Sequence, residues 1–169
     1  MAYDCPMVWL TDKATAETNS NEGGILLSEH ENLIARTRFK IGTDTTKPLS
    51  LATHLFGVRD YHVNYAFWAW CYDGVLAYGQ QSNNAGQSAK KTVTTDYKMY
   101  QGTWYTIEVV YKKGFGWVTN VIPDEGEAYY GTVPGTANFG LSRIKMIDFF
   151  NTYEVGVGVH SYIDYVEIY

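Results

Sequence analysis

Residues 61–74, with the sequence YHVNYAFWAWCYDG, alternate in character with a period of two. The odd positions are almost wholly apolar, namely Tyr61, Val63, Tyr65, Phe67, Ala69 and Cys71. The even positions run from polar to flat aromatic side chains, namely His62, Asn64, Ala66, Trp68, Trp70 and Tyr72. Such alternation is typical of a β-strand with one buried face. We therefore predict a strand here whose odd positions face the core.

The rest of the sequence repeats this strand pattern. Asp73-Gly74 leads into VLAYG (75–79) and predicts a two-residue hairpin, because both residues tolerate positive φ. Further strand candidates are 24–27, 32–42, 49–58, 103–114, 116–122, 144–150, 155–159 and 161–169. Two polar stretches, 79–91 and 122–140, are expected to be long loops, and only a short segment near 11–18 tolerates a helix. Many short strands without a helical period predict an all-β, two-sheet antiparallel β-sandwich, or jelly roll.

Composition agrees with this fold class and excludes some partners. The 169 residues predict a single domain, 1–169, and 15 Tyr, 5 Trp, 7 Phe and 16 Gly favour strands and turns over helices. The net charge is −5, and no basic cluster exceeds a short pair, which argues against a nucleic acid partner. No apolar stretch is long enough to span a membrane, so we expect no membrane insertion.

The two cysteines and the N-terminus bear on the compartment. Cys71 falls on the apolar face of its strand, where a free buried thiol is commoner than a bridge to Cys5. The start MAYDCPMVWL lacks the basic residues and long apolar run of a signal peptide. We expect a soluble protein that stays in the cytoplasm, leaves without a cleavable signal, or is part of a longer secreted chain. An extracellular or virion-surface location is favoured.

Three stretches carry a resemblance to a known family, namely ARTRFKIG (35–42), GTWYTIEVVYKKG (102–114) and YIDYVEIY (162–169). In this order they resemble an early strand, a central strand and the closing strand of the concanavalin A-like lectin/glucanase jelly rolls, particularly their laminin-G-like members. The resemblance implies the same sandwich fold and a carbohydrate ligand. Asp164 resembles a family position that more often ties down a turn than binds a structural calcium ion.

The sequence argues against an enzyme. Glucanases that this chain resembles place carboxylates at i, i+2 and i+4 on one strand, whereas Glu108 stands alone and Asp164 and Glu167 fall on opposite faces. The acidic run 124–127 is read as a solvated turn. The four histidines, His30, His54, His62 and His160, lack the spacing of metal ligands. We therefore expect no cofactor, and a carboxylate pair assembled from distant strands is the remaining route to a hydrolase or lyase.

A candidate ligand site lies on the even face of 61–74. The hairpin register pairs Trp68 with Gly79 and Trp70 with Ala77, which leaves room for flat rings that can stack on sugars. The predicted ligand-binding residues are Trp68, Trp70, Tyr72, His62, Asn64, Arg36 and Arg38, with the arginines included if their strand is a neighbour. If the rings are such a platform, removing them should leave folding intact.

Other interpretations of these residues stay open. Trp68 and Trp70 also fit packing beneath a loop, or a protein interface, and Arg36 and Arg38 also fit a plain solvated face. The preferred function is a non-catalytic, lectin-like module for a polysaccharide or cell-surface glycan. The alternatives are a structural or adhesive virion protein, in contact with neighbouring subunits, and a hydrolase or lyase of the same fold.

Overall fold

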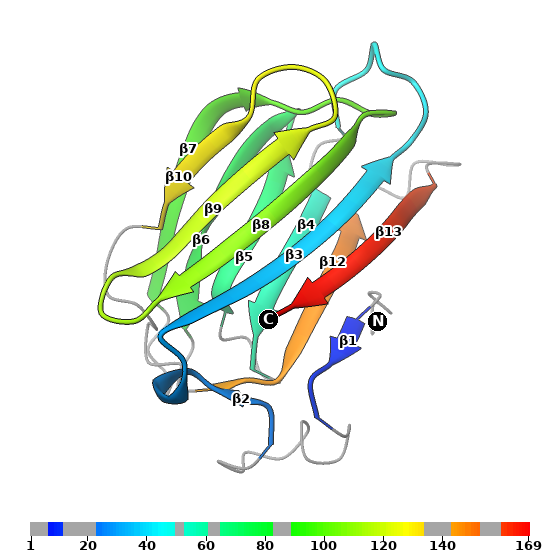
Figure 1. The fold of residues 1–169 in the computed structure, drawn as a ribbon. Coiled ribbons are helices and arrows are strands. Elements are labelled where there is room, and N and C mark those ends of the chain that lie inside the picture. Colours follow the sequence, from blue (N-terminus) through cyan, green and yellow to red (C-terminus); the bar gives the residue numbers. More distant parts are fainter. Residues whose placement is uncertain are drawn as a thin grey trace.

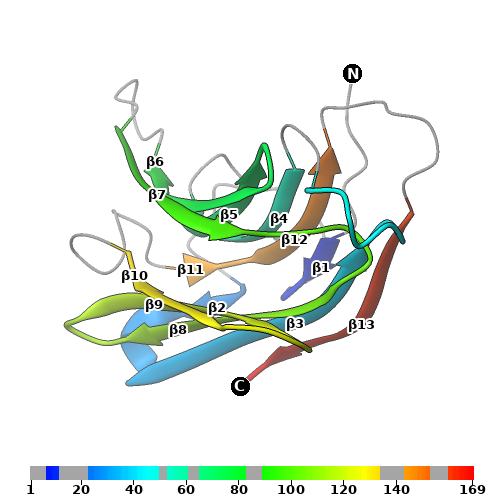
Figure 2. The same ribbon diagram turned by 90° about the horizontal axis from the view of Figure 1, so that it is seen from above.

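The protein is a sandwich of two antiparallel β-sheets, as Figures 1 and 2 show. The structure is a computed structural model, and it describes residues 7–11, 23–49, 53–60, 65–82, 89–133, 143–152 and 160–169. The prediction of an all-β jelly roll is confirmed. The described part contains no helix that is both long enough and apolar enough to cross a membrane.

Two sheets and a small ribbon contain the described strands. The six-stranded sheet has the spatial order β1 (Met7–Trp9), β12 (Met146–Thr152), β4 (Thr53–Arg59), β5 (Tyr65–Tyr72), β6 (Val75–Ser82) and β7 (Ala89–Lys98). The five-stranded sheet has the order β10 (Tyr129–Thr132), β9 (Gly116–Pro123), β8 (Trp104–Lys112), β3 (Asn32–Ile41) and β13 (Ser161–Ile168). The ribbon pairs β2 (Ile25–Leu26) with β11 (Arg143–Ile144), and a single 3₁₀ turn, η1, covers Leu27–Glu29.

The predicted hairpin at Asp73-Gly74 is confirmed, with Trp68 opposite Gly79 and Trp70 opposite Ala77. Both turn residues have positive φ, 47° for Asp73 and 78° for Gly74, as a tight connection of twisted strands requires. This turn fixes which side chains of β5 and β6 share a face.

The two long loops expected from the sequence are shorter than predicted. β6 and β7 take up much of 79–91, and β10 lies inside 122–140. The alternation of β7 and β10 is weak in the sequence because both are edge strands. On them, few positions face the core and most side chains are polar. The strand expected at 155–159 and, apart from Thr11, the segment near 11–18 lie outside the described residues.

The core fills the space between the sheets and follows the predicted alternation. On β5, Phe67 and Cys71 are fully buried, and Phe67 packs with its ring centroid 6.2 Å from that of Phe56 on β4. On β8, Ile107 is fully buried and faces the same interior. Cys71 is a free thiol, as predicted, and Cys5 lies outside the described residues.

The six-stranded sheet is curved. Figure 2 shows β7 and β12, toward its two sides, turning away from the five-stranded sheet, so that its outer face is concave. β4 and β5 lie in the middle of this sheet. The even positions of β5 therefore belong to the floor of the concave face.

Candidate functional site

Trp68 is at the centre of the concave face but is not an open platform. Its cross-strand neighbours are Gly57 on β4 and Gly79 on β6. Because neither neighbour has a side chain, nothing at these two positions separates the indole from the sheet. The Nζ atom of Lys90 lies 4.9 Å from the ring centroid, and Trp70 packs edge-on at 6.5 Å between centroids. Only 4% of Trp68 is exposed. The expectation of a bare ring at this position is therefore corrected: packing covers it.

Trp70 and Tyr72 continue the same row and are accessible. Trp70 is half-buried, and Tyr72 is 61% exposed. Their partners on β6 are Ala77 and Val75, which are too small to cover a ring. These two side chains therefore present aromatic surface to solvent beside a strip of small residues.

Edge strand β7 supplies the polar border of this strip. Its outward side chains Lys90, Thr92 and Thr94 are exposed, and they stand opposite Gln81, Gly79 and Ala77 respectively on β6. These residues lie outside the site predicted from the sequence, because 79–91 is predicted as a polar loop and 92–98 is not among the predicted strands. The alternation of KTVTTDYK within 91–98 was the signal that could have revealed the strand.

A compact polar cluster flanks Trp68 on the side opposite β7. The Nε atom of Arg59 lies 3.0 Å from Oδ2 of Asp148, and the hydroxyl of Tyr65 donates to the same oxygen at 3.3 Å. The Arg59 guanidinium also lies over the Tyr65 ring, 5.1 Å from its centroid. Asp148 is only 2% exposed, so this buried carboxylate is held as an ion pair. The sequence offered no signal for it, because β4 and β12 are distant in the chain.

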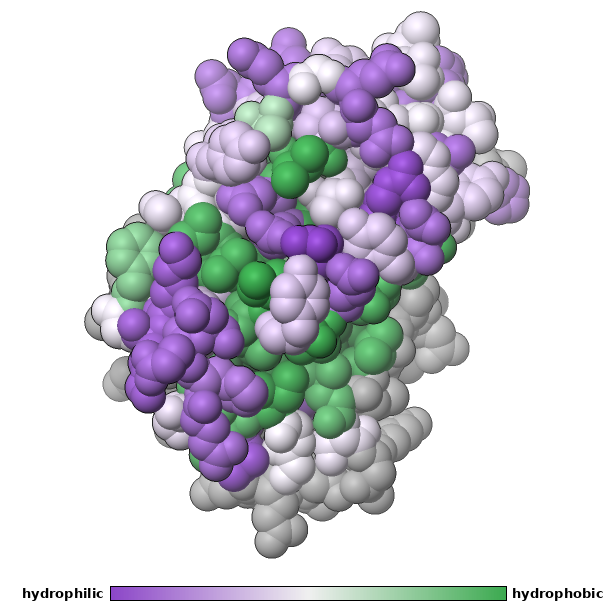
Figure 3. All heavy atoms as spheres, viewed as in Figure 1, coloured by the Kyte–Doolittle hydropathy of each residue, from purple (hydrophilic) through white to green (hydrophobic). Residues whose placement is uncertain are grey.

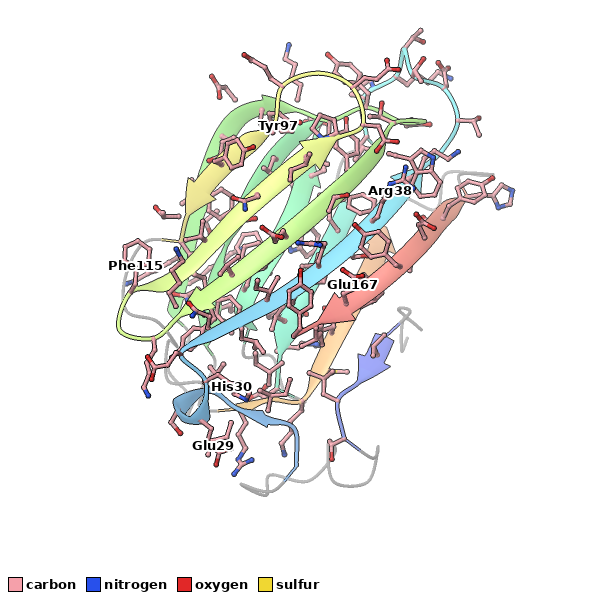
Figure 4. The ribbon with its side chains drawn as sticks, in the orientation of Figure 1. Glu29, His30, Arg38, Tyr97, Phe115 and Glu167 are labelled. Carbon is pink, nitrogen blue, oxygen red and sulfur yellow. The ribbon has the colours of Figure 1, made fainter. Side chains whose placement is uncertain are left out.

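The four remaining predicted site residues are His62, Asn64, Arg36 and Arg38. His62 and Asn64 lie outside the described residues. Arg36 and Arg38 lie on β3 in the five-stranded sheet, so the condition for including them, a strand next to the tryptophan strand, is not met. Their outward side chains are separated from Trp68 by the whole thickness of the sandwich. In Figure 4, Arg38 lies over β3 and Glu167 over β13, on the face that Figure 1 presents.

Acidic side chains pair with both arginines. Two nitrogens of Arg36 donate to Oε2 of Glu108, at 3.0 and 2.5 Å, and Asn120 donates to the other oxygen at 2.9 Å. Arg38 donates to Asp164 at 2.6 Å and to Asp124 at 2.7 Å. The hydrogen bond to Glu108 raises the pKa of Arg36, and the bond to Asp124 raises that of Arg38. These pairings favour a surface ion network over a ligand role.

Aromatic side chains complete this network. Arg38 lies over the ring of Trp104 at 4.5 Å, and Lys40 lies over both Trp104 and Tyr162 at 4.9 Å. Figure 3, which views this face, shows hydrophilic side chains crossing its middle. Trp104 and Glu108 thus point outward from β8.

The described residues offer no metal centre. They contain no group of three or more His, Cys, Asp and Glu side chains that could hold a metal ion. Asp164, considered for calcium, is engaged by Arg38. The run 124–127 is exposed, as predicted.

Two hollows lie at one end of the sandwich, apart from the aromatic row. Each has a volume of about 460 Å³, and they share Thr103 and Glu125 in their walls. The hollow with more lining residues includes Tyr97, which lies near the β9–β10 loop (Figure 4). The Tyr97 hydroxyl donates to the backbone oxygen of Glu127 at 3.0 Å. Among the predicted site residues that the structure describes, none lines either hollow.

Comparisons with known proteins identify the fold. No protein-family model matches the sequence, and no curated protein matches it. An alginate lyase from Pseudomonas aeruginosa is similar in structure, with a TM-score of 0.54 and 6% identity over 88% of this chain and 68% of the lyase. Chicken galectin 2 is similar with a TM-score of 0.50 and 8% identity, over 81% of this chain and 89% of the galectin.

A third similar structure comes from a much longer chain. The binding domain of botulinum neurotoxin serotype D has a TM-score of 0.54 and 14% identity over 90% of this chain, which spans only 35% of that domain. At such identities a likeness establishes the fold alone. The chain has the concanavalin A-like jelly-roll fold that its sequence resembles.

Proposed function

We propose that this protein is a non-catalytic carbohydrate-binding module whose ligand lies along the outer face of the six-stranded sheet. One observation carries the proposal: Trp70 and Tyr72 present adjacent rings to solvent on a concave face, beside Ala77 and the exposed hydroxyls of β7. Aromatic rings stack on the apolar faces of sugars, while hydroxyl side chains bind their hydroxyl groups. The likeness to a lyase named for the polysaccharide alginate, and to a galectin, supports a sugar ligand on this fold.

The same surface gives little support for catalysis. Asp148 is a buried carboxylate on this face, but Arg59 and Tyr65 already hold it. A glycosidase needs a second carboxylate across the scissile bond. An activity screen on neutral and anionic polysaccharides at high protein concentration tests this alternative, and measurable turnover would replace the binding role by a hydrolase or lyase.

Affinity electrophoresis in polysaccharide-containing gels, or a glycan array, tests the binding role directly. Tyr72→Ala and Trp70→Ala should each reduce retention. The matched control is Tyr130→Ala on β10, because Tyr130 is 68% exposed but lies on the other sheet. Equal retention of all three variants and the wild type would remove the site.

An adhesive role on a virion is compatible with the same surface, since a particle can hold glycans through such a module. The genes that neighbour this one would separate the two settings. Capsid and tail genes would favour the virion role, and glycosidase genes would favour a free-standing module.

A further inference from the structure

We propose that the concave face selects sugars bearing an oxyanion, a carboxylate or a sulfate ester, at a site formed by the ammonium group of Lys90 and the indole N–H of Trp68. This inference rests on the glycan binding proposed above and adds the chemical class of the ligand. It follows from two hydrogen-bond donors that lie together and have no acceptor among the residues that the structure describes.

The first donor is Lys90. Its Nζ atom lies 4.9 Å from the centroid of the Trp68 ring, a cation–π contact that holds the ammonium over the centre of the face. Lys90 is exposed, and it forms no ion pair within the described part of the chain. The nearby carboxylate of Asp148 is taken by Arg59. The ammonium group is therefore available to bind an anion.

The second donor is the Nε1–H of Trp68. This nitrogen is buried and has no hydrogen-bond partner among the residues that the structure describes. An unsatisfied buried donor is unfavourable, and an unpartnered group of this kind in a folded protein calls for an explanation. A ligand oxygen that reaches the indole would satisfy it.

The sheet register explains why the two donors meet. Lys90 stands opposite Gln81. This pair is two pairs along the strands from the row in which Trp68 is followed by Gly79 and Thr92. Gly79 has no side chain, so the lysine can lean across it onto the indole. The β7 backbone also approaches Gly79 so closely that an added Cβ would lie 1.9 Å from the oxygen of Lys91. The site therefore depends on this glycine.

An oxyanion matches this pair better than a neutral hydroxyl. Its oxygens accept hydrogen bonds from both an ammonium and an N–H, and its charge compensates Lys90, which has no ion pair among the described residues. A neutral sugar can use the rings of Trp70 and Tyr72 but leaves Lys90 without a counter-charge.

The test uses matched polymers and a matched control lysine. Affinity electrophoresis compares hydroxyethyl cellulose with C6-oxidised cellulose for the carboxylate, and dextran with dextran sulfate for the sulfate. We expect the wild type to bind at least one anionic polymer about tenfold more tightly than its neutral counterpart. Lys90→Gln should remove most of that preference, whereas Lys98→Gln, also exposed on β7, should not. Higher salt should weaken anionic binding in the wild type more than in Lys90→Gln.

Trp68→Phe tests the indole N–H separately, because it keeps a ring beneath Lys90 and removes the donor. Anionic binding should fall several-fold while neutral binding persists, with circular dichroism confirming the fold. Equal affinity for anionic and neutral polymers, or equal effects of Lys90→Gln and Lys98→Gln, would overturn this inference and leave the glycan-binding role intact. No retention by any of the four polymers would count against both.

Discussion

The outer faces of the two sheets carry similar residue types but differ in how many of their charged and aromatic side chains are engaged by partners. On the five-stranded sheet, Arg36 and Arg38 each form ion pairs with carboxylates from other strands or loops, and Trp104 is covered by cations. On the six-stranded sheet, Trp70 and Tyr72 remain accessible, and Lys90 has no carboxylate partner in the described part of the chain. The first face has few unused donors, whereas the second keeps both donors and aromatic surface for a ligand.

The difference shows that residue type alone does not make a binding face. Arginine and tryptophan on a strand suggest ligand binding equally well on either sheet. A guanidinium that already donates to two carboxylates must lose those bonds before it can bind a sugar or an anion. The state of pairing, which depends on neighbouring strands, therefore decides which face is available.

The largest expected effect separates the inner and outer positions of β5. Phe67→Ala should lower the free energy of unfolding by about 3–5 kcal/mol, because it leaves a cavity in the core. Trp68→Ala should lower the free energy of unfolding by a similar amount, because that ring is also buried. This result would reverse the expectation that removing the ring leaves folding intact. Urea unfolding of both variants checks this. Tyr72→Ala is the exposed control, and a stable Trp68→Ala would restore the open-platform interpretation.

A second prediction concerns the accessible ring of the concave face. Trp70→Ala should weaken glycan binding by about 1–3 kcal/mol, the range of aromatic side chains that contact a ligand. Binding isotherms with the best-retained polysaccharide measure this. The comparison of the two faces breaks if Trp104→Ala, on the five-stranded sheet, weakens binding as much.

Alkaline pH tests the inner side of the same hairpin. Burial raises the pKa of the Cys71 thiol from 9.0 to about 12, so the unfolded chain loses this proton first. The contribution of the Cys71 thiol to the free energy of unfolding is fully present below pH 9 and is lost as the pH rises toward 12. Within that window, the free energy of unfolding should fall by up to about 1.4 kcal/mol per pH unit.

Urea unfolding at several pH values, for the wild type and Cys71→Ala, isolates this contribution. Burial also raises the pKa of Tyr97 to about 12, so part of the alkaline loss will persist in the variant. Identical slopes in both proteins would show that the thiol is not buried as described.

The smallest effect is expected on the paired face. Arg36→Gln and Arg38→Gln should leave glycan binding unchanged and lower the melting temperature by only a few degrees, because solvent screens these partly exposed ion pairs. Thermal melts and the polysaccharide gels used above check both statements. A loss of binding in either variant would mean that the paired face also holds ligand.

Much of the fold could be predicted from the sequence. The period-two alternation gave the central strands, and Asp73-Gly74 gave the hairpin with its register. The edge strands β7 and β10 were missed because an edge strand needs few apolar residues and resembles a polar loop. The site was predicted in part: Trp70 and Tyr72 lie on the expected face, but Lys90 was hidden in the missed strand.

The sequence by itself determined which side chains of β5 point inward and which point outward, because alternation along a strand is a local property of the backbone. Only the tertiary structure decided which strands lie next to one another. That arrangement placed Arg36 and Arg38 among carboxylates on one sheet and Trp68 between two glycines, beneath Lys90, on the other. Pairing and burial depend on contacts between residues far apart in the chain, and a local pattern does not contain them.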